Sequence, residues 1–209
     1  YGVDKPDLRY ALEITDLTKL IGIDTAPFVA EALKAGGRVR GLVVAGAADA
    51  SRKELDALTA LAKSAGAGGL MWAKKTGDVW EGQGVKAIGA SALEKLNAPV
   101  GTLVLAVSGP DRITSPALHA VRTELVKRPG TRMVEDHAFL WIVDFPLFEV
   151  GEHGERIFAH HPFTSPHPED IAYFESDPDR CRALHYDAVY KGNELGTGSM
   201  RITDPAVQQ

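Results

Sequence analysis

The sequence holds a single cysteine, Cys181, among its 209 residues, and no long apolar run. One cysteine excludes an intrachain disulfide and a zinc site built from several cysteines, and it is typical of a protein from a reducing cytosol. No apolar run approaches the roughly 20 residues that span a bilayer, and the printed sequence does not open with a secretory signal peptide. We therefore expect a cytoplasmic protein without a membrane-spanning helix.

An excess of positive charge is also lacking. The chain has 23 Lys and Arg against 28 Asp and Glu, a formal net charge of −5. This balance excludes a chain that grips nucleic acid over its whole surface, and we expect no DNA partner. A local basic edge for RNA remains an alternative, although a solvated charged face is favoured. The residues of that edge are Arg38, Arg40, Arg52, Lys53, Lys74 and Lys75.

The 44% apolar and 24% charged residues are ordinary for a globular protein with a sizeable core. Their distribution indicates two regions. Residues 22–109 are rich in Gly and Ala and lack His, whereas six of the seven histidines follow residue 136. The two regions meet near residues 129–130.

The first region alternates predicted strands with predicted helices, as in an α/β module. Apolar runs predict strands at residues 40–45, 70–74 and 102–107. Capping-box patterns at Ser51–Glu54 and Ser91–Glu94 predict two helix starts. Ser115 followed by Pro116 predicts a third.

The second region has a predominantly β pattern. The run FLWIV at residues 139–143 predicts a strand, and residues 160–170 form a proline-rich loop. Two further strands, at residues 184–190 and 194–202, are joined by a predicted Gly192-Asn193 turn. No helix separates them, so we expect antiparallel pairing.

Two carboxylates on this hairpin, Asp187 and Glu194, are candidate ligands for a Mg²⁺ ion bound to phosphates. With a Gly192-Asn193 turn, Glu194 would lie opposite Lys191, and Asp187 would lie about 13 Å along the strand. One shared ion would then require a bulge or another register. The alternative is that both are surface charges beside a turn.

The second predicted strand carries Gly196, Gly198 and Arg201. Glycine weakens a strand unless something approaches its backbone closely, as a flat ligand does. Arg201 could bind a carboxylate or phosphate through two parallel hydrogen bonds. A surface arginine paired with a neighbouring acid is the alternative.

His160 and His161 precede the proline-stiffened loop, and their spacing to His167 fits no common zinc pattern. Recognition of an anion or an amide suits adjacent imidazoles better, and a solvated loop is the alternative. No G-x-S-x-G motif supports a serine hydrolase. The residues alone therefore indicate a site for an anionic ligand on an antiparallel sheet.

Four strings, in this order, resemble bacterial-type aspartyl-tRNA synthetases. They are YGVDKPDLR at 1–9, WIVDFPLFE at 141–149, HHPFTSP at 160–166, and Asp187 followed by GNELGTGSMR at 192–201. The Gly- and Ala-rich region lies where this family carries its insertion (GAD) domain. The resemblance covers essentially the whole chain.

The resemblance implies an α+β fold, with an inserted α/β (GAD-like) module between two pieces of a class II antiparallel catalytic core. It places catalytic-core segments at residues 1–26 and 130–209 and the insertion at residues 27–129. The implied activity is ATP-dependent formation of aspartyl-adenylate and transfer of aspartate to tRNA, in a homodimeric ligase. The insertion is either structural or contacts tRNA.

The resemblance also implies roles for individual residues, none of them a nucleophile. Asp187 and Glu194 hold the Mg²⁺ of ATP, with Glu194 also contacting ATP. Arg201 binds the side-chain carboxylate of aspartate. The remaining implied contacts are His160 and His161 in the amino-acid pocket, and Gly196, Gly198 and Ser199 beneath the adenylate.

The chain departs from the family at Thr197, where Gly is usual, at Lys191, where Asn is usual, and at Thr203, where His is usual. We expect the anticodon-binding barrel and motifs 1, 2 and 3 to lie outside this sequence, so the 209 residues alone should be inactive. The alternative is a non-catalytic module that binds tRNA or a protein, either a truncated paralogue or a subunit like that of a tRNA-dependent amidotransferase.

Overall fold

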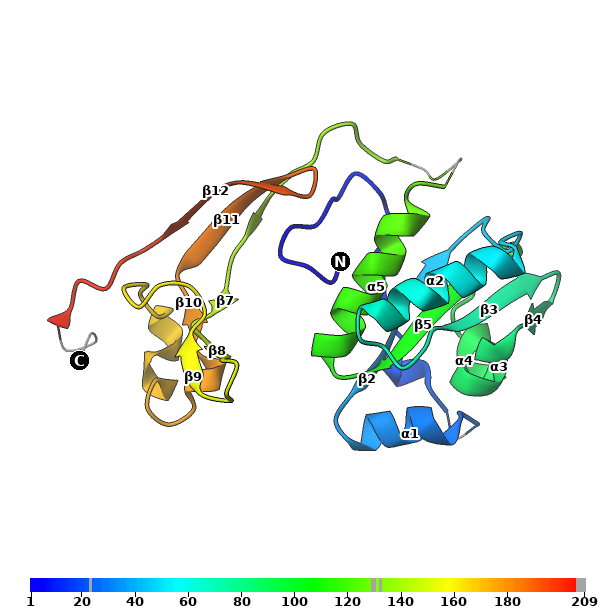
Figure 1. Cartoon of the computed structure of the whole chain (residues 1–209), viewed down its shortest axis with the longest axis horizontal. Helices are drawn as coiled ribbons and strands as arrows, with labels where there is room; N and C mark the ends of the chain where they lie inside the picture. The colour runs from blue at the N-terminus through cyan, green and yellow to red at the C-terminus, as the bar shows by residue number, and fades with distance from the viewer. Residues whose placement is uncertain (23, 129–130, 132, 206–209) are drawn as a thin grey trace. The chain divides into compact units, whose positions relative to one another are not determined.

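The structure, a computed structural model, describes residues 1–22, 24–128, 131 and 133–205. The chain divides into two compact units, which are described separately (Figure 1). Unit 1 comprises Tyr1–Val3 and Tyr10–Val134, and unit 2 comprises Asp4–Arg9 and Glu135–Gln209. Both combine short helices with antiparallel sheets, so the mixed α and β character expected from the sequence is confirmed.

Unit 1 is built on a five-stranded sheet in the order β1-β2-β5-β3-β4, with antiparallel pairing throughout. Its strands are β1 (Ile14–Asp16), β2 (Arg38–Val44), β3 (Met71–Thr76), β4 (Val79–Glu81) and β5 (Leu103–Gly109). The three predicted strands correspond to β2, β3 and β5. The central strand β5 is buried along almost its whole length, which explains why its sequence is a continuous apolar run.

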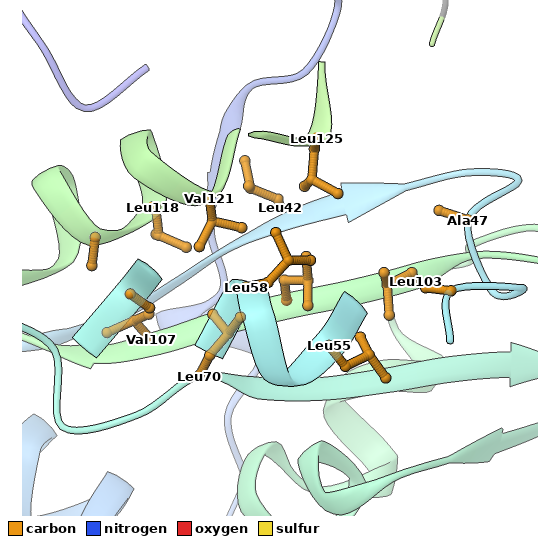
Figure 2. Packing of buried hydrophobic residues seen from close by; sticks show 14 of the residues in the cluster. Leu42, Ala47, Leu55, Leu58, Leu70, Leu103, Val107, Leu118, Val121 and Leu125 are labelled. Atoms are coloured by element: carbon orange, nitrogen blue, oxygen red, sulfur yellow. The ribbon is translucent and has the colours of Figure 1, made fainter. Parts of the chain in front are cut away.

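Helices cover both faces of this sheet. They are α1 (Pro27–Lys34), α2 (Arg52–Ser64), α3 (Gln83–Ile88), α4 (Ala90–Glu94) and α5 (Asp111–Leu125), with the 3₁₀ helix η1 (Thr18–Leu20). Leucines of α2 and α5 pack on one face over Leu42, Leu103 and Leu105 (Figure 2). On the other face α1, α3 and α4 pack over Val104 and Ala106. Successive residues of β5 thus point into two separate cores, as the twofold periodicity of a strand requires.

The helix starts show where local patterns succeed and fail. The capping box at Ser51 is confirmed: Ser51 Oγ accepts from the Glu54 amide at 3.2 Å, and Glu54 Oε2 accepts from the Ser51 amide at 2.7 Å. The other two predicted starts are wrong. Gly89, not Ser91, caps α4, and α5 begins at Asp111, so Pro116 lies inside the helix.

Most of the possible RNA-binding edge is engaged within unit 1. Arg38 and Arg40 both pair with Asp111, and Arg52 pairs with Asp56. The ammonium groups of Lys74 and Lys75 donate to the backbone carbonyls of Ala50 and Ala98. Because their charged groups are already paired within the unit, these basic residues are better interpreted as an ordinary charged face than as an RNA-binding edge.

Unit 2 holds a three-stranded antiparallel sheet in the order β12-β11-β6, as predicted for the C-terminal hairpin. Its strands are β6 (Phe139–Ile142), β11 (His185–Tyr190) and β12 (Asn193–Ser199). Two small strand pairs accompany it, β7 (Phe145–Pro146) with β10 (Arg182–Ala183) and β8 (Phe148–Val150) with β9 (Arg156–Phe158). Two 3₁₀ helices, η2 (Pro168–Tyr173) and η3 (Pro178–Arg180), complete the unit.

The division into units differs from the boundaries drawn on the sequence after residues 26 and 129. β1 pairs with β2, and this pairing joins residues 14–16 to unit 1. The assignment of an insertion module and a catalytic core to these parts stays a prediction. In the part of the chain that the structure describes, no helix has the length and apolar character needed to cross a membrane.

Candidate active site

The turn of the C-terminal hairpin determines which side chains share a face of the sheet. Tyr190 pairs with Asn193, so the two turn residues are Lys191 and Gly192, with φ angles of 52° and 77°. The prediction of a Gly192-Asn193 turn is therefore wrong. Consecutive left-handed residues give the turn the twist that two-residue hairpins favour.

A bulge between Ala188 and Val189 shifts the register further, because Ala188 pairs with Gly196 while Val189 pairs with Glu194. The predicted pairing of Glu194 with Lys191 is thus also wrong. Glu194 now shares a face with Val189 and Asp187 and lies about 7 Å, two residues, along the strand from Asp187. Along the strand, the two residues are therefore separated by about half of the 13 Å expected.

Asp187 is the most buried polar residue of this face. Its side chain is 6% exposed, and Oδ1 lies 3.3 Å from Nε2 of His185, whose side chain is 10% exposed. The same His185 nitrogen lies 3.1 Å from Oγ1 of Thr197, which pairs with Asp187 across the hairpin. Apart from this approach of His185, Oδ1 of Asp187 has no partner with hydrogen-bond geometry among the described residues, so the carboxylate can still accept a cation or a donor.

Glu194 is held by the first segment of unit 2. Lys5 Nζ lies 2.9 Å from Glu194 Oε2, and this hydrogen bond raises the pKa of Lys5. The backbone of Lys5 also approaches Gly192 of the turn. The position of Glu194 is therefore one that attracts a cation.

The two adjacent histidines have different surroundings. His160 stacks on His185, with ring centroids 3.8 Å apart, and Phe145 contacts both rings edge-on. Desolvation, and then the neighbouring His185 ring, lower the pKa of His160. His161 instead packs against Phe163 and accepts its backbone N–H at 3.2 Å. His160 is thus placed over the face of Asp187, whereas the contacts of His161 lie within its own loop.

The residues of the glycine-rich strand divide between the two faces. Ser199 pairs with His185 and shares the face of Asp187. Gly198 pairs with Tyr186 and lies on the opposite face, where a Cβ atom would be 2.5 Å from the Tyr186 hydroxyl. A Cβ at Gly196 would meet only open space. The packing of the Tyr186 ring therefore requires a residue without a side chain at position 198. At position 196, glycine leaves the backbone of the strand uncovered.

Arg201 lies two residues beyond Ser199 and pairs with Thr164 through an isolated antiparallel bridge. Its side chain is exposed. No ion pair of its guanidinium is found within residues 1–22, 24–128, 131 and 133–205. The cation is therefore accessible to an anion from solution.

Sequence reasoning missed two members of this cluster, Lys5 and His185. Lys5 lies in the YGVDKPDLR string, and only the tertiary structure places it beside Glu194. His185 lies two residues before Asp187 on the same strand, so the alternation of a β-strand places both side chains on one face. The sequence alone could have shown this.

The described residues hold no group of three His, Cys, Asp or Glu side chains that could bind a metal ion on their own. Asp187 and Glu194 are nevertheless hard oxygen donors on one face, and Mg²⁺ bound to a nucleotide takes one or two protein carboxylates and completes its shell with phosphate oxygens and water. The buried Asp187 carboxylate can still accept a ligand, and Glu194 already attracts the ammonium group of Lys5, so both positions suit a cation.

Comparison with known proteins gives this cluster a family context. The family described as "tRNA synthetases class II (D, K and N)" matches residues 1–209. The chain is 41% identical to the Aspartate--tRNA(Asp/Asn) ligase of Geotalea uraniireducens over 213 residues and 41% identical to that of Caldanaerobacter subterraneus subsp. tengcongensis over 219 residues. It is 38% identical to the Aspartate--tRNA ligase of Clostridium kluyveri over 221 residues. Each match covers 100% of this chain and 36% of the relative.

Proposed function

The chain belongs to the class II tRNA synthetases of the D, K and N group, and from this membership we propose that it acts as part of an aspartate–tRNA ligase. In the proposed reaction, the aspartate α-carboxylate attacks the α-phosphorus of ATP, forming aspartyl-adenylate and releasing pyrophosphate. A terminal ribose hydroxyl of tRNA then accepts the aspartyl group. Unit 2 would supply part of the catalytic core, and residues 27–129 would form the GAD-like insertion.

The observation that supports this proposal most strongly is the shared face of Asp187, Glu194 and Ser199, with His160 stacked above it. Such a face offers carboxylates, a hydroxyl and an imidazole around exposed backbone, and it contains no activated nucleophile. Adenylate formation needs none, because the substrate carboxylate is the nucleophile. Catalysis then consists of positioning the substrates and stabilising charge.

Each candidate residue of the site has a proposed task. Asp187 and Glu194 would hold the Mg²⁺ of ATP, which supplies neutralisation of the phosphate charge. Arg201 would bind the side-chain carboxylate of aspartate, because a guanidinium fork matches a carboxylate. His160 would line the amino-acid pocket, with His161 beside it in the loop. Ser199 would lie beneath the adenylate on the face of Asp187, and Gly196 and Gly198 would contribute only their backbone there, because their Cβ positions lie on the opposite face.

The chain spans about a third, 36%, of the length of these relatives, so the complete activity belongs to a longer assembly in this proposal. Motifs 1, 2 and 3 and the anticodon-binding barrel would come from the other segments of the ligase, which would be a cytoplasmic homodimer. The 209 residues alone are expected to show no adenylate formation.

The test is aspartate-dependent exchange of pyrophosphate into ATP, measured for the whole ligase, in which this chain is joined to the other segments that its relatives carry. Robust exchange by the whole ligase and none by residues 1–209 is the expected result. Absence of exchange in the whole ligase would instead favour the non-catalytic binding module.

A single substitution tests the residue that would recognise aspartate. Arg201→Ala should reduce kcat/KM for aspartate by roughly a hundredfold, because a charged partner of the substrate is lost, and should leave KM for ATP nearly unchanged. Arg156→Ala, which removes an exposed arginine that pairs with Asp179, is the matched control. An unchanged kcat/KM for aspartate in Arg201→Ala would refute the assignment.

A further inference from the structure

Outside the carboxylate face, unit 2 contains a network of charged residues centred on Arg182. This guanidinium donates to Asp170 through Nε at 2.7 Å and through Nη2 at 3.0 Å, and the Arg182 amide donates to the same carboxylate at 2.9 Å. Nη2 also donates to Glu169 at 2.9 Å. The carboxylate of Asp170 therefore receives three hydrogen bonds from one residue, two of them from the guanidinium fork.

The carboxylate of Asp170 is more buried than those of Glu169 and Asp179, which also form ion pairs in this unit, although the Arg182 side chain is itself 35% exposed. The side chain of Asp170 is 10% exposed, against 75% for Glu169 and 72% for Asp179, which pairs with Arg156 elsewhere in the unit. The hydrogen bonds from Arg182 lower the pKa of Asp170 to about 2. The pair is thus ionised over the whole physiological range and fixed in one geometry.

Arg182 belongs to β10, which lies between two segments of the candidate site. On one side, Ala183 pairs with Phe145, whose ring contacts His160 and His185. On the other side, Ala183 forms a bridge to Pro166 in the proline-rich loop. A displacement of β10 would therefore move the aromatic support of His160.

The proline-rich loop in turn connects β10 to the segment that carries Arg201. The Leu184 amide donates to the Ser165 carbonyl at 2.9 Å, and the Ser165 amide donates to the Met200 carbonyl at 2.8 Å. Thr164 pairs with Arg201 itself. The backbone on either side of Arg201 is thus tied to β10 through one short loop.

We propose that Asp170 and Arg182 are positioning residues for the aspartate half of the site: they fix β10 and, through it, the His160 ring and the backbone of Arg201. This inference rests on the proposed function. It predicts a larger effect on aspartate than on ATP. The segments that carry His160 and Arg201 are tied to β10 directly, whereas Asp187 is reached only through Phe145 and His185, and Glu194 is held by Lys5.

The deciding experiment compares Asp170→Asn with Asp179→Asn in the whole ligase. Both substitutions neutralise a carboxylate paired with an arginine, but only the first belongs to the network. Asp170→Asn should raise KM for aspartate about tenfold, since small misplacements of binding groups are costly, with KM for ATP changed by less than about twofold. Asp179→Asn should leave both constants unchanged.

Several outcomes would overturn the inference. A folded Asp170→Asn enzyme with an unchanged KM for aspartate, or with equal increases in both KM values, would do so. If Asp170→Asn fails to fold, Arg182→Lys, which keeps the charge and the backbone hydrogen bond, takes its place. Failure of both to fold would assign the pair to stability alone and equally overturn the positioning role.

A second measurement separates this inference from the proposed function. In the 209-residue chain, Asp170→Asn should shift the ring ¹⁵N and ¹H NMR signals of His160 and His185, whereas Asp179→Asn should not. A wild-type ligase without exchange activity would refute the proposed function, while these signals would still test the positioning role. Unshifted imidazole signals in a folded Asp170→Asn chain would refute the latter.

Discussion

At the scale of single residues, the candidate site is marked by the buried carboxylate of Asp187, whose Oδ1 lies 3.3 Å from His185 Nε2. Beyond His185, no described group forms a hydrogen bond of good geometry with Asp187 Oδ1, so this carboxylate can accept a further donor or a cation. Its neighbour on the same face, Glu194, already pairs with the ammonium group of Lys5. A cation from the protein thus lies where the proposed function requires a metal ion, and the two should compete.

This competition predicts that substitutions of Glu194 and of Lys5 change the Mg²⁺ requirement in opposite directions. In the whole ligase, Glu194→Gln should raise the Mg²⁺ concentration for half-maximal pyrophosphate exchange by roughly tenfold, the equivalent of one lost charged contact. Lys5→Ala should lower that concentration, because it frees the Glu194 carboxylate. The measurement is a Mg²⁺ titration of the exchange rate at fixed ATP. A shift in the same direction for both variants would contradict the competition.

The ionisation of Asp170 predicts a pH dependence of stability. Its pKa is about 2, below the ordinary value of about 3.9, so the folded state binds this proton less readily than the unfolded chain. The stabilisation is complete above the ordinary pKa and is lost as the pH falls from about 4 to about 2. The free energy of unfolding of unit 2, measured with urea, should therefore fall less steeply over this pH window in Asp170→Asn than in the wild type. Identical slopes in both chains would exclude the Asp170–Arg182 pair as the cause, and Asp179→Asn serves as the control.

At the scale of secondary-structure elements, the hairpin of β11 and β12 depends on a lysine in a left-handed conformation. Lys191 has a φ of 52°, which costs a residue with a Cβ roughly 1–2 kcal/mol and costs Asn less. Lys191→Asn should therefore have a free energy of unfolding higher than Lys191→Ala by about 0.5–1 kcal/mol. Comparing these two variants cancels the contact between the Lys191 ammonium and the Tyr190 ring, which both lose. Equal stabilities in urea unfolding would contradict a role of the turn conformation.

The elements show which parts of the fold the sequence can predict. β5 and the helix that begins at Ser51 follow from an apolar run and a capping box, both of them local. The helix starts at Ser91 and Ser115 were wrong because these hydroxyls have distant partners: Ser91 donates to Asp24, and Ser115 accepts from Arg40 at 2.8 Å. A competing tertiary hydrogen bond cannot be recognised from the local pattern.

The candidate site could be predicted only as a set of residues, not as a geometry. The resemblance selected Asp187 and Glu194, but their approach depends on a bulge and on which residues form the turn. Gly192 belongs to the turn in both arrangements, but its partner there is Lys191 and not Asn193, and the turn lies against the segment that carries Lys5. That segment is more than 180 residues away in the sequence, and no local rule places it there.

At the scale of the whole molecule, the two units differ in how much apolar surface they bury. Unit 1 has two extensive clusters on the two faces of its sheet. The described part of unit 2 has one small cluster built around Leu147, Cys181 and Ala183, and two aromatic side chains of β6, Phe139 and Trp141, are 70% and 65% exposed. A unit of this size with so small a core is expected to be marginally stable.

Heating the 209-residue chain should therefore produce two transitions, with unit 2 unfolding first. Trp72 and Trp80 report on unit 1 and Trp141 reports on unit 2, so Trp141→Phe leaves a fluorescence signal from unit 1 alone. In that variant the fluorescence midpoint should lie above the lower of the two midpoints seen by circular dichroism. Amide hydrogen exchange provides the independent readout: β5 should be protected more strongly than β11, since its amides open only with the larger core. Coincident midpoints with equal protection of the two strands would mean that the units unfold as one, and the small core of unit 2 would then not limit the stability of the chain.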